Sequence, residues 1–222
     1  ADVRIAILDS CASGALIRGK GGIRRSPFLM DQSSQVKGHA YLTSSSADEV
    51  AQESDRIGAS YFTHHLVTGL RGAADVNNDR RVTLSEAYQY AFHQTLQRTE
   101  KTRKGPQHPN YDFELAGSGD VVITALHRMA STMRFAKHLG GRVFIRDTRG
   151  RLVAELNKHP GRRMELGLTP GRYRVNLHAE DKLYIHDVHL ERGRRVPITT
   201  ESFKVVQNRE NTRSRGGVTP QI

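Results

Sequence analysis

The sequence has no tryptophan, a single cysteine and only 6% aromatic residues. One cysteine excludes an internal disulfide and a zinc site built from several cysteines. No stretch approaches the roughly 20 apolar residues that a membrane-spanning helix needs, so we expect no membrane span. The first twelve residues carry three charges and lack a basic start, which argues against a signal peptide. The chain enters an apolar segment without a methionine, so we expect a piece of a longer protein.

The positive charge is confined to one part of the chain. The formal net charge is +11, yet the first 125 residues hold 14 Lys/Arg and 14 Asp/Glu, whereas the rest hold 20 and 9. This contrast predicts two parts with different surfaces. A basic surface attracts nucleic acid, anionic lipid or an acidic protein, or it is simply a solvated face. The missing recognition motif and the few aromatic residues favour a solvated face and argue against nucleic acid.

Residues 1–125 show the pattern of an α/β protein. Apolar runs over 3–8 and 40–43 predict buried strands of a mostly parallel sheet, and a third strand is predicted over 120–124. Helical spacing of apolar residues predicts helices over 60–72 and 84–96, flanking that sheet. Loops are expected over 18–37 and 99–110. Small polar residues follow the first two strands, at the sheet edge where ligands bind in open α/β sheets.

The pattern changes near residue 141 to short alternating runs separated by turns. These runs predict a small antiparallel β-sandwich over 141–206. We therefore expect a first domain over 1–128, a linker over 129–140, the sandwich, and a flexible tail over 207–222. The segment from Leu168 to Val175 resembles the turn-and-strand signature of carboxypeptidase-regulatory or PEGA-type modules, which bind or space other domains.

Cys11 lies directly after the first predicted strand, among small residues. Small neighbours let a substrate backbone approach, and Gly14 allows backbone geometries that other residues resist. Backbone N–H groups in such a turn, at Cys11 and Gly14, could hold an oxyanion. A thiol that acts as a nucleophile near neutral pH also needs a partner, most often histidine. The alternative is a lone cysteine that serves as a small buried apolar residue.

The segment from Ile7 to Gly14 resembles the catalytic-cysteine segment of caspase-like cysteine peptidases (peptidase family C14), in particular the metacaspase and bacterial branch. Residues 43–53 and 60–72 are similar to later segments of the same family, so the resemblance covers about residues 1–125. It implies a partial caspase-like fold and a thiol endopeptidase with Cys11 as nucleophile. It also implies a protein or peptide substrate, in a cleft lined by Ser44, Ser45 and Ser46. Ala12 stands where the family often has a histidine that is not the general base.

The same resemblance places the catalytic histidine on the strand before the cysteine strand. Only ten residues precede Cys11, so we expect this histidine in a missing N-terminal segment or on a separate chain. The resemblance assigns its role to none of the histidines nearest in sequence, which are His39, His64, His65 and His93. If the histidine has been lost, the alternative is a catalytically inactive caspase-like scaffold for protein interaction or signalling. An adaptor acting through the basic part is a third alternative.

Asp9 stands two residues before the cysteine. The family resemblance gives this position to substrate selection, and a carboxylate there pairs with Arg or Lys. We therefore predict cleavage after basic residues; alternatively, Asp9 only fixes the turn. The basic loop over 18–37 would then offer sites of self-processing, at Arg18, Lys20, Arg24, Arg25 and Lys37.

Residues 75–86 fit the twelve-residue EF-hand template for calcium. Its ligand positions are filled by Asp75, Asn77, Asp79, the carbonyl of Arg81, Thr83 and Glu86. The departure is Arg80, at the position where glycine normally makes the sharp turn. The alternative is a degenerate loop that caps the second helix, with Thr83 as N-cap and Glu86 as its capping-box partner.

Overall fold

A three-stranded mixed sheet forms one side of the molecule. The computed structural model describes residues 3–10, 36–47 and 49–206. The sheet has the order β1 (Val3–Leu8), β2 (Lys37–Thr43) and β6 (Asn110–Ala116). β1 pairs with β2 in parallel, whereas β2 pairs with β6 antiparallel. The carboxyl ends of β1 and β2 therefore meet at one edge of the sheet.

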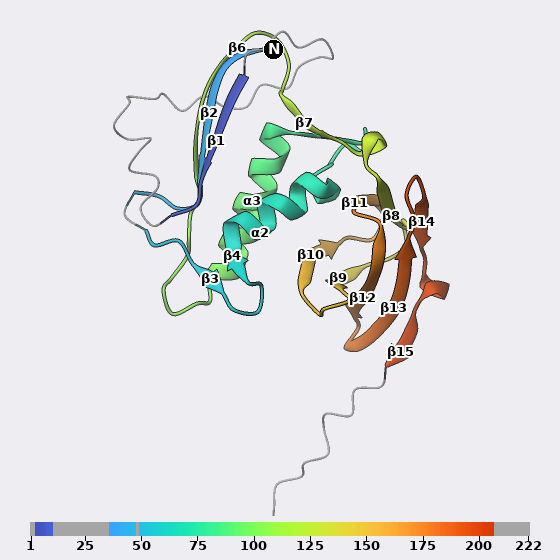
Figure 1. Ribbon diagram of the computed structural model, residues 1–222. Helices are drawn as coiled ribbons and strands as arrows, with labels where there is room; N and C mark the ends of the chain where they lie inside the picture. Colours follow the sequence, from blue (N-terminus) through green and yellow to red (C-terminus); the bar gives the residue numbers. More distant parts are fainter. Residues whose placement is uncertain (1–2, 11–35, 48, 207–222) are drawn as a thin grey trace, which may run out of the picture.

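Two helices cover one face of this sheet (Figure 1). They are α2 (Tyr61–Thr68), continued by the π-helical turn η1 (Gly69–Ala73), and α3 (Leu84–Thr99). Leu42 of β2, Phe62 and Leu66 of α2 and Leu84 of α3 are buried in one apolar core. Apolar residues at helical spacing form the inner faces of both helices, as their sequence predicts. Gly72 interrupts the helical geometry inside η1 with φ of 125°, a conformation that favours glycine.

Short paired strands connect these elements. β3 (Glu53–Ser54) pairs with β4 (Ala59–Ser60) just before α2. β5 (Arg81–Thr83) leads into α3 and pairs with β7 (Val122–Ala125). A short 3-10 helix, η2 (Leu126–Arg128), follows β7.

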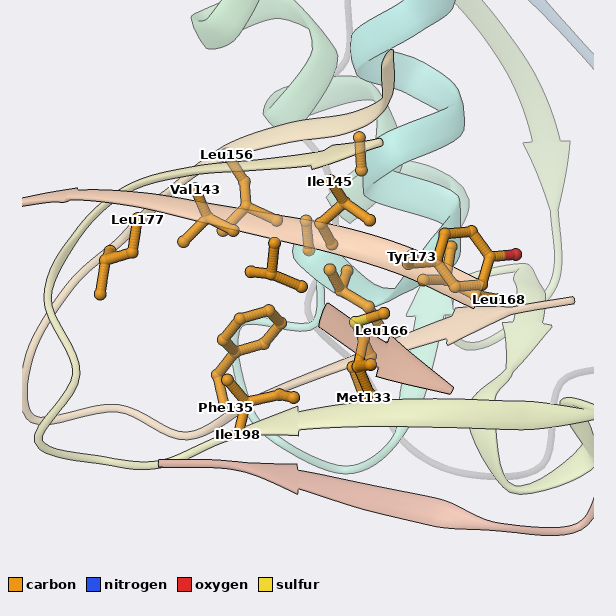
Figure 2. Packing of buried hydrophobic residues seen from close by; sticks show 14 of the residues in the cluster. Met133, Phe135, Val143, Ile145, Leu156, Leu166, Leu168, Tyr173, Leu177 and Ile198 are labelled. Carbon is orange, nitrogen blue, oxygen red and sulfur yellow. The ribbon is translucent and has the colours of Figure 1, made fainter. Parts of the chain in front are cut away.

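Two further sheets share a second core, which Figure 2 shows from close by. The first sheet has the order β10-β9-β12-β13-β15, and the second has the order β11-β8-β14. Met133 and Phe135 from one sheet and Ile145 and Leu156 from the other are almost fully buried between them. The bounds of the strands and of the last 3-10 helix are β8 (Ser131–Phe135), β9 (Gly141–Asp147), β10 (Leu152–Lys158), β11 (Met164–Leu168), β12 (Gly171–Ala179), β13 (Lys182–Leu190), β14 (Arg195–Ile198), η3 (Thr200–Ser202) and β15 (Lys204–Val206).

These strands do not form a separate domain. α2 contacts β10, and η1 contacts β11. Ala73 of η1 belongs to the core of the two sheets, and Tyr90 of α3 packs against that core. The helices consequently lie between the first sheet and the other two (Figure 1).

A buried carboxylate lies at the same junction. Glu155 of β10 is only 3% exposed, and it accepts hydrogen bonds from Arg98 of α3 and Arg142 of β9. Arg56, in the turn between β3 and β4, lies 3.5 Å from the second carboxylate oxygen. Removing the partners of a buried carboxylate is strongly destabilising, because its charge is then left uncompensated. The junction is therefore a specific contact rather than a loose linker.

The structure corrects several sequence-based expectations. The chain is of mixed α and β type, but its described part shows neither a caspase-like fold nor a separate sandwich domain, because the sheets share their contacts with the helices. The first sheet is mixed rather than mostly parallel, since its third strand is β6 and not the predicted strand at 120–124, which forms β7. Within the part of the chain that the structure describes, β1 is a half-exposed edge strand, not a buried one. The predicted linker over 129–140 contains β8, whose Met133 and Phe135 belong to the core.

Other expectations are confirmed. The predicted helices over 60–72 and 84–96 correspond to α2 with η1 and to α3. The alternating runs after residue 141 form strands β9, β10, β12 and β13. No helix among the described residues is long and apolar enough to cross a membrane.

Candidate functional site

The carboxyl ends of β1 and β2 are joined by hydrogen bonds just before the position of the cysteine. The backbone N–H of Ser44 donates to the carbonyl of Leu8 over 2.9 Å. The hydroxyl of Ser44 donates to the carbonyl of Ser10 over 3.3 Å. Ser44 and Ser45 are fully buried, whereas Ser46 is half-buried. The three serines predicted to line a cleft therefore differ, because only Ser46 retains appreciable exposure to solvent.

Asp9 is held in place by the first turn of α2. Its Oδ2 accepts hydrogen bonds from the hydroxyl of Ser60 and, over 2.6 Å, from the hydroxyl of Thr63. Ser60 is also the N-cap of α2, since its hydroxyl accepts from the N–H of Thr63 over 3.1 Å. The partial positive charge at a helix N-terminus favours a carboxylate in this position. Asp9 itself is an exposed residue at the sheet edge.

Gln107 connects the loop after α3 to the end of β2. It is fully buried, and its amide N–H donates to the carbonyl of Ser44 over 2.6 Å. Its Oε1 accepts from the backbone N–H of Gln52 over 2.8 Å. Sequence reasoning missed Gln107 because it lies in a polar, Pro- and Gly-containing segment that looks like an ordinary loop. A lone glutamine carries no local signal that it bridges two distant segments.

Glu49 and His108 form a second contact between the same two segments. The backbone N–H of His108 donates to one carboxylate oxygen of Glu49, and the ring Nδ1 lies 2.6 Å from the other. Burial alone would raise the pKa of Glu49, but these hydrogen bonds and the nearby imidazole outweigh burial and lower it. The contact thus holds the chain that follows Ser46 in a fixed position.

The main catalytic prediction falls outside the described residues. Cys11 and Gly14 lie there, as do four of the predicted self-cleavage sites, namely Arg18, Lys20, Arg24 and Arg25. Lys37 is described, and it does not lie in a loop. It is the first residue of β2, and it is paired with Ala116 of β6. A peptidase binds its substrate as an unpaired extended chain, so Lys37 is a poor cleavage site in this fold.

None of the four histidines considered from the sequence lies at the sheet edge. His64 and His65 are buried on α2, and His39 lies 2.9 Å from Glu114 on the sheet. His93 is exposed on α3. The prediction that these histidines do not supply the general base therefore remains open, because the position of the cysteine is not described.

The predicted calcium loop has a well-defined backbone. Arg80 adopts a left-handed conformation with φ of 67°, so it makes the turn that glycine makes in the template. Asn77 Oδ1 accepts from the N–H of Asp79, and Asp79 Oδ1 accepts from the N–H of Arg81, both over 2.8 Å. Asp75 Oδ2 accepts from the N–H of Arg80 over 3.0 Å. The loop is therefore closed by its own side chains.

Two other carboxylates of the loop, those of Asp79 and Glu86, act on Asp75. Its Oδ1 is buried and has no hydrogen-bond partner among the described residues. Burial raises the pKa of Asp75, and the negative charges of Asp79 and Glu86 raise it further, against hydrogen bonds from loop N–H groups. Glu86, however, caps α3: its Oε2 accepts from both the N–H and the hydroxyl of Thr83 over 3.0 Å. In this arrangement the described residues contain no group of three or more His, Cys, Asp or Glu side chains placed to hold a metal ion.

Comparison with known proteins adds no further assignment. No protein-family model matches the chain, and no curated protein is similar enough to count as a relative. The resemblance to caspase-like peptidases accordingly remains a prediction from the residues of segments 7–14, 43–53 and 60–72.

Proposed function

We propose that the chain is the nucleophile-bearing part of a cysteine endopeptidase that cleaves after Arg or Lys. The observation that supports this proposal is the exposed carboxylate of Asp9, held by Ser60 and Thr63 two residues before Cys11. A fixed carboxylate pairs with the guanidinium or ammonium group of a basic side chain without first paying the cost of ordering. The same carboxylate repels an acidic residue in that position.

The proposed reaction is acyl transfer through the thiolate of Cys11. The thiolate adds to the peptide carbonyl carbon, and backbone N–H groups at the turn stabilise the resulting oxyanion. Collapse of this intermediate expels the amine, which takes a proton from the histidine partner, and water then hydrolyses the thioester. The histidine would be supplied by a segment upstream of the given sequence or by a separate chain. The fold that we propose for the complete catalytic unit is caspase-like, with a partial sheet supplied by β1, β2 and β6.

An active-site probe tests the nucleophile and the specificity separately. The protein with its upstream segment is treated with an acyloxymethyl ketone that carries Arg, and in parallel with one that carries Asp. We expect labelling by the Arg probe only, and none in Cys11→Ala. In Asp9→Asn the labelling rate should fall roughly 10- to 150-fold, because a hydrogen bond to a charged partner contributes about 1.5–3 kcal/mol. Absence of labelling by either probe would favour the inactive scaffold, and a preference for Asp would overturn the proposed specificity.

Calcium binding at residues 75–86 is a second candidate function. It is supported by the unpartnered Oδ1 of Asp75 and by Arg80, which adopts the required turn without glycine. Calcium would neutralise the repulsion among Asp75, Asp79 and Glu86, but Glu86 must first leave Thr83 to become the bidentate ligand. That exchange costs part of the helix cap, so we expect weak binding, with a dissociation constant on the order of 10⁻⁴–10⁻³ M.

Isothermal titration with CaCl₂ measures this binding directly. Asp75→Asn should abolish the heat, whereas Asp55→Asn, at an exposed position in the turn between β3 and β4, serves as a charge-matched control and should preserve it. The calcium site would be refuted if both variants lost binding equally, or if the wild type gave no heat at millimolar calcium. The loop would then serve only to cap α3.

A further inference from the structure

A basic pocket opens on the outer face of the five-stranded sheet. It measures about 630 Å³ and is lined by the ends of β9, β12 and β13. We propose that this pocket binds an acidic segment of another protein through Arg146 and Arg172. The proposal does not depend on peptidase activity, because the pocket is built from strands that follow residue 140.

Strand register brings the cations of the pocket together. Arg174 of β12 lies directly opposite Arg146 of β9, and Arg172 lies opposite His189 of β13. Directly opposed residues of antiparallel strands have Cα atoms about 4.5–5.5 Å apart. Like charges at directly opposed positions, here Arg146 and Arg174, are destabilising unless something compensates them. The fold therefore holds a concentration of positive charge that an anionic partner would relieve.

The carboxylates of the pocket compensate only part of this charge. Asp187 binds Arg174 through two hydrogen bonds of 2.7 and 2.9 Å. Asp147 is engaged with Arg151, whose Nε lies 2.8 Å from its Oδ2.

Two arginines of the pocket keep uncompensated charge. Arg146 donates to the backbone carbonyl of Gly150 over 2.9 Å, and Arg172 is exposed. Neither forms an ion pair with any carboxylate of the described residues. These two guanidinium groups are the ones left for a ligand.

The spacing of the cations suits an extended acidic peptide. Arg146 lies opposite Arg174, so Arg172, two residues along the same strand, is its diagonal neighbour on the same face, about 7–8 Å away. Carboxylates at alternate positions of an extended peptide have the same spacing. A single-stranded nucleic acid typically also stacks its bases on exposed aromatic side chains. The tyrosine of the pocket, Tyr173, is instead buried, and its hydroxyl donates to the carbonyl of Thr169 over 2.8 Å.

Fluorescence anisotropy with a labelled peptide of alternating Glu and Ser tests this assignment. The wild type is compared with the double variant Arg146→Gln/Arg172→Gln and with a matched control, Arg192→Gln/Arg194→Gln. The control removes the same charge from exposed positions in the turn between β13 and β14, outside the pocket. We expect the pocket variant to bind roughly 2- to 25-fold more weakly, because each of the two exposed ion pairs changes an equilibrium constant by about 1.5- to 5-fold. The control should change the dissociation constant less than about twofold.

Two further measurements, the dependence of binding on salt and the binding of an oligonucleotide, complete the experiment. Binding of the wild type should weaken as NaCl rises from about 0.05 to 0.3 M, because exposed charges are screened. An equal loss in both variants would show attraction to overall charge and overturn the pocket. Tighter binding of a single-stranded oligonucleotide, with the same dependence on Arg146 and Arg172, would assign the site to nucleic acid instead. No peptide binding at low salt would also refute the proposal, provided that circular dichroism shows the wild type to be folded.

Discussion

Acidification should weaken the contact between α2 and β10, because two neutral histidines are buried there. His64 is 7% exposed and His65 is 1% exposed. Burial lowers the pKa of His64 from 6.5 to about 4, with Arg71 and Arg98 adding to the decrease and Glu155 opposing it. Burial, followed by the charge of the neighbouring imidazole, lowers the pKa of His65 to about 3. His64 Nε2 and both ring nitrogens of His65 have no hydrogen-bond partner among the described residues.

The size of the effect follows from proton linkage. As pH falls through 6.5, these histidines take up protons in the unfolded chain, whereas in the folded chain they stay neutral until about pH 4 or below. The unfolded state binds more protons in this window, so stability rises with pH and is lost as pH falls. At pH 5 each histidine should therefore reduce the free energy of unfolding by about 2 kcal/mol relative to pH 7.5, and the pair by about 4 kcal/mol.

Urea unfolding at several pH values between 7.5 and 5 measures this loss. In the double variant His64→Gln/His65→Gln, the free energy of unfolding should depend much less on pH between 7.5 and 5 than in the wild type. This expectation holds whatever the stability of the variant at pH 7.5. The control His93→Gln, which removes an exposed histidine of α3, should keep the pH dependence of the wild type. A wild-type loss below about 1 kcal/mol would contradict the burial argument, since even one such histidine supplies twice that amount. If the free energy of unfolding of the double variant changes with pH as steeply as that of the wild type, His64 and His65 are not the cause of the pH dependence.

Three further substitutions test other contacts, each by urea unfolding at pH 7.5. Glu155→Gln should destabilise the fold by about 1.5–3 kcal/mol, because the partly exposed Arg98 and Arg142 lose a charged hydrogen-bond acceptor. Gly72→Ala should cost about 1–3 kcal/mol from the strained φ alone and more from contact, since the new Cβ would lie 2.2 Å from the carbonyl oxygen of Glu165. Thr83→Ala removes the N-cap of α3 and should cost about 1 kcal/mol. A loss below about 0.5 kcal/mol in any of the three would contradict the corresponding contact.

The periodic segments of the fold could be predicted, whereas the pairing of its strands could not. Helices α2 and α3 follow from apolar residues at helical spacing, and the capping box of α3 is visible in the sequence as Thr83 and Glu86. β6 was missed because its apolar side chains, Tyr111, Phe113 and Leu115, alternate with polar ones over a single short run next to a proline-containing loop. Strand order depends on contacts between distant segments, which local patterns do not encode.

The candidate site shows the same division. The carboxyl ends of β1 and β2 were expected at one edge because parallel strands end together, and their hydrogen bonds join Ser44 to Leu8 and Ser10. The partners of Asp9 could not be predicted, because Ser60 and Thr63 reach it across some fifty residues of chain. In the sequence these hydroxyls only mark the start of a helix.

Helix α2 contacts both the candidate site and the five-stranded sheet that contains β10. Its first turn holds Asp9, and α2 also contacts β10, whose Glu155 acts on the pKa of His64 and of His65. Eight helical residues span only about 12 Å, and a helix of this length moves as a unit. A change at Glu155 that shifts β10 must therefore either break the contact with α2 or displace the hydroxyl groups that orient Asp9. In the labelling experiment Glu155→Gln should consequently slow reaction with the Arg probe, although Glu155 is not at the sheet edge. If the rate is unchanged in folded Glu155→Gln, the two ends of α2 act independently and the strands after residue 140 serve other partners only.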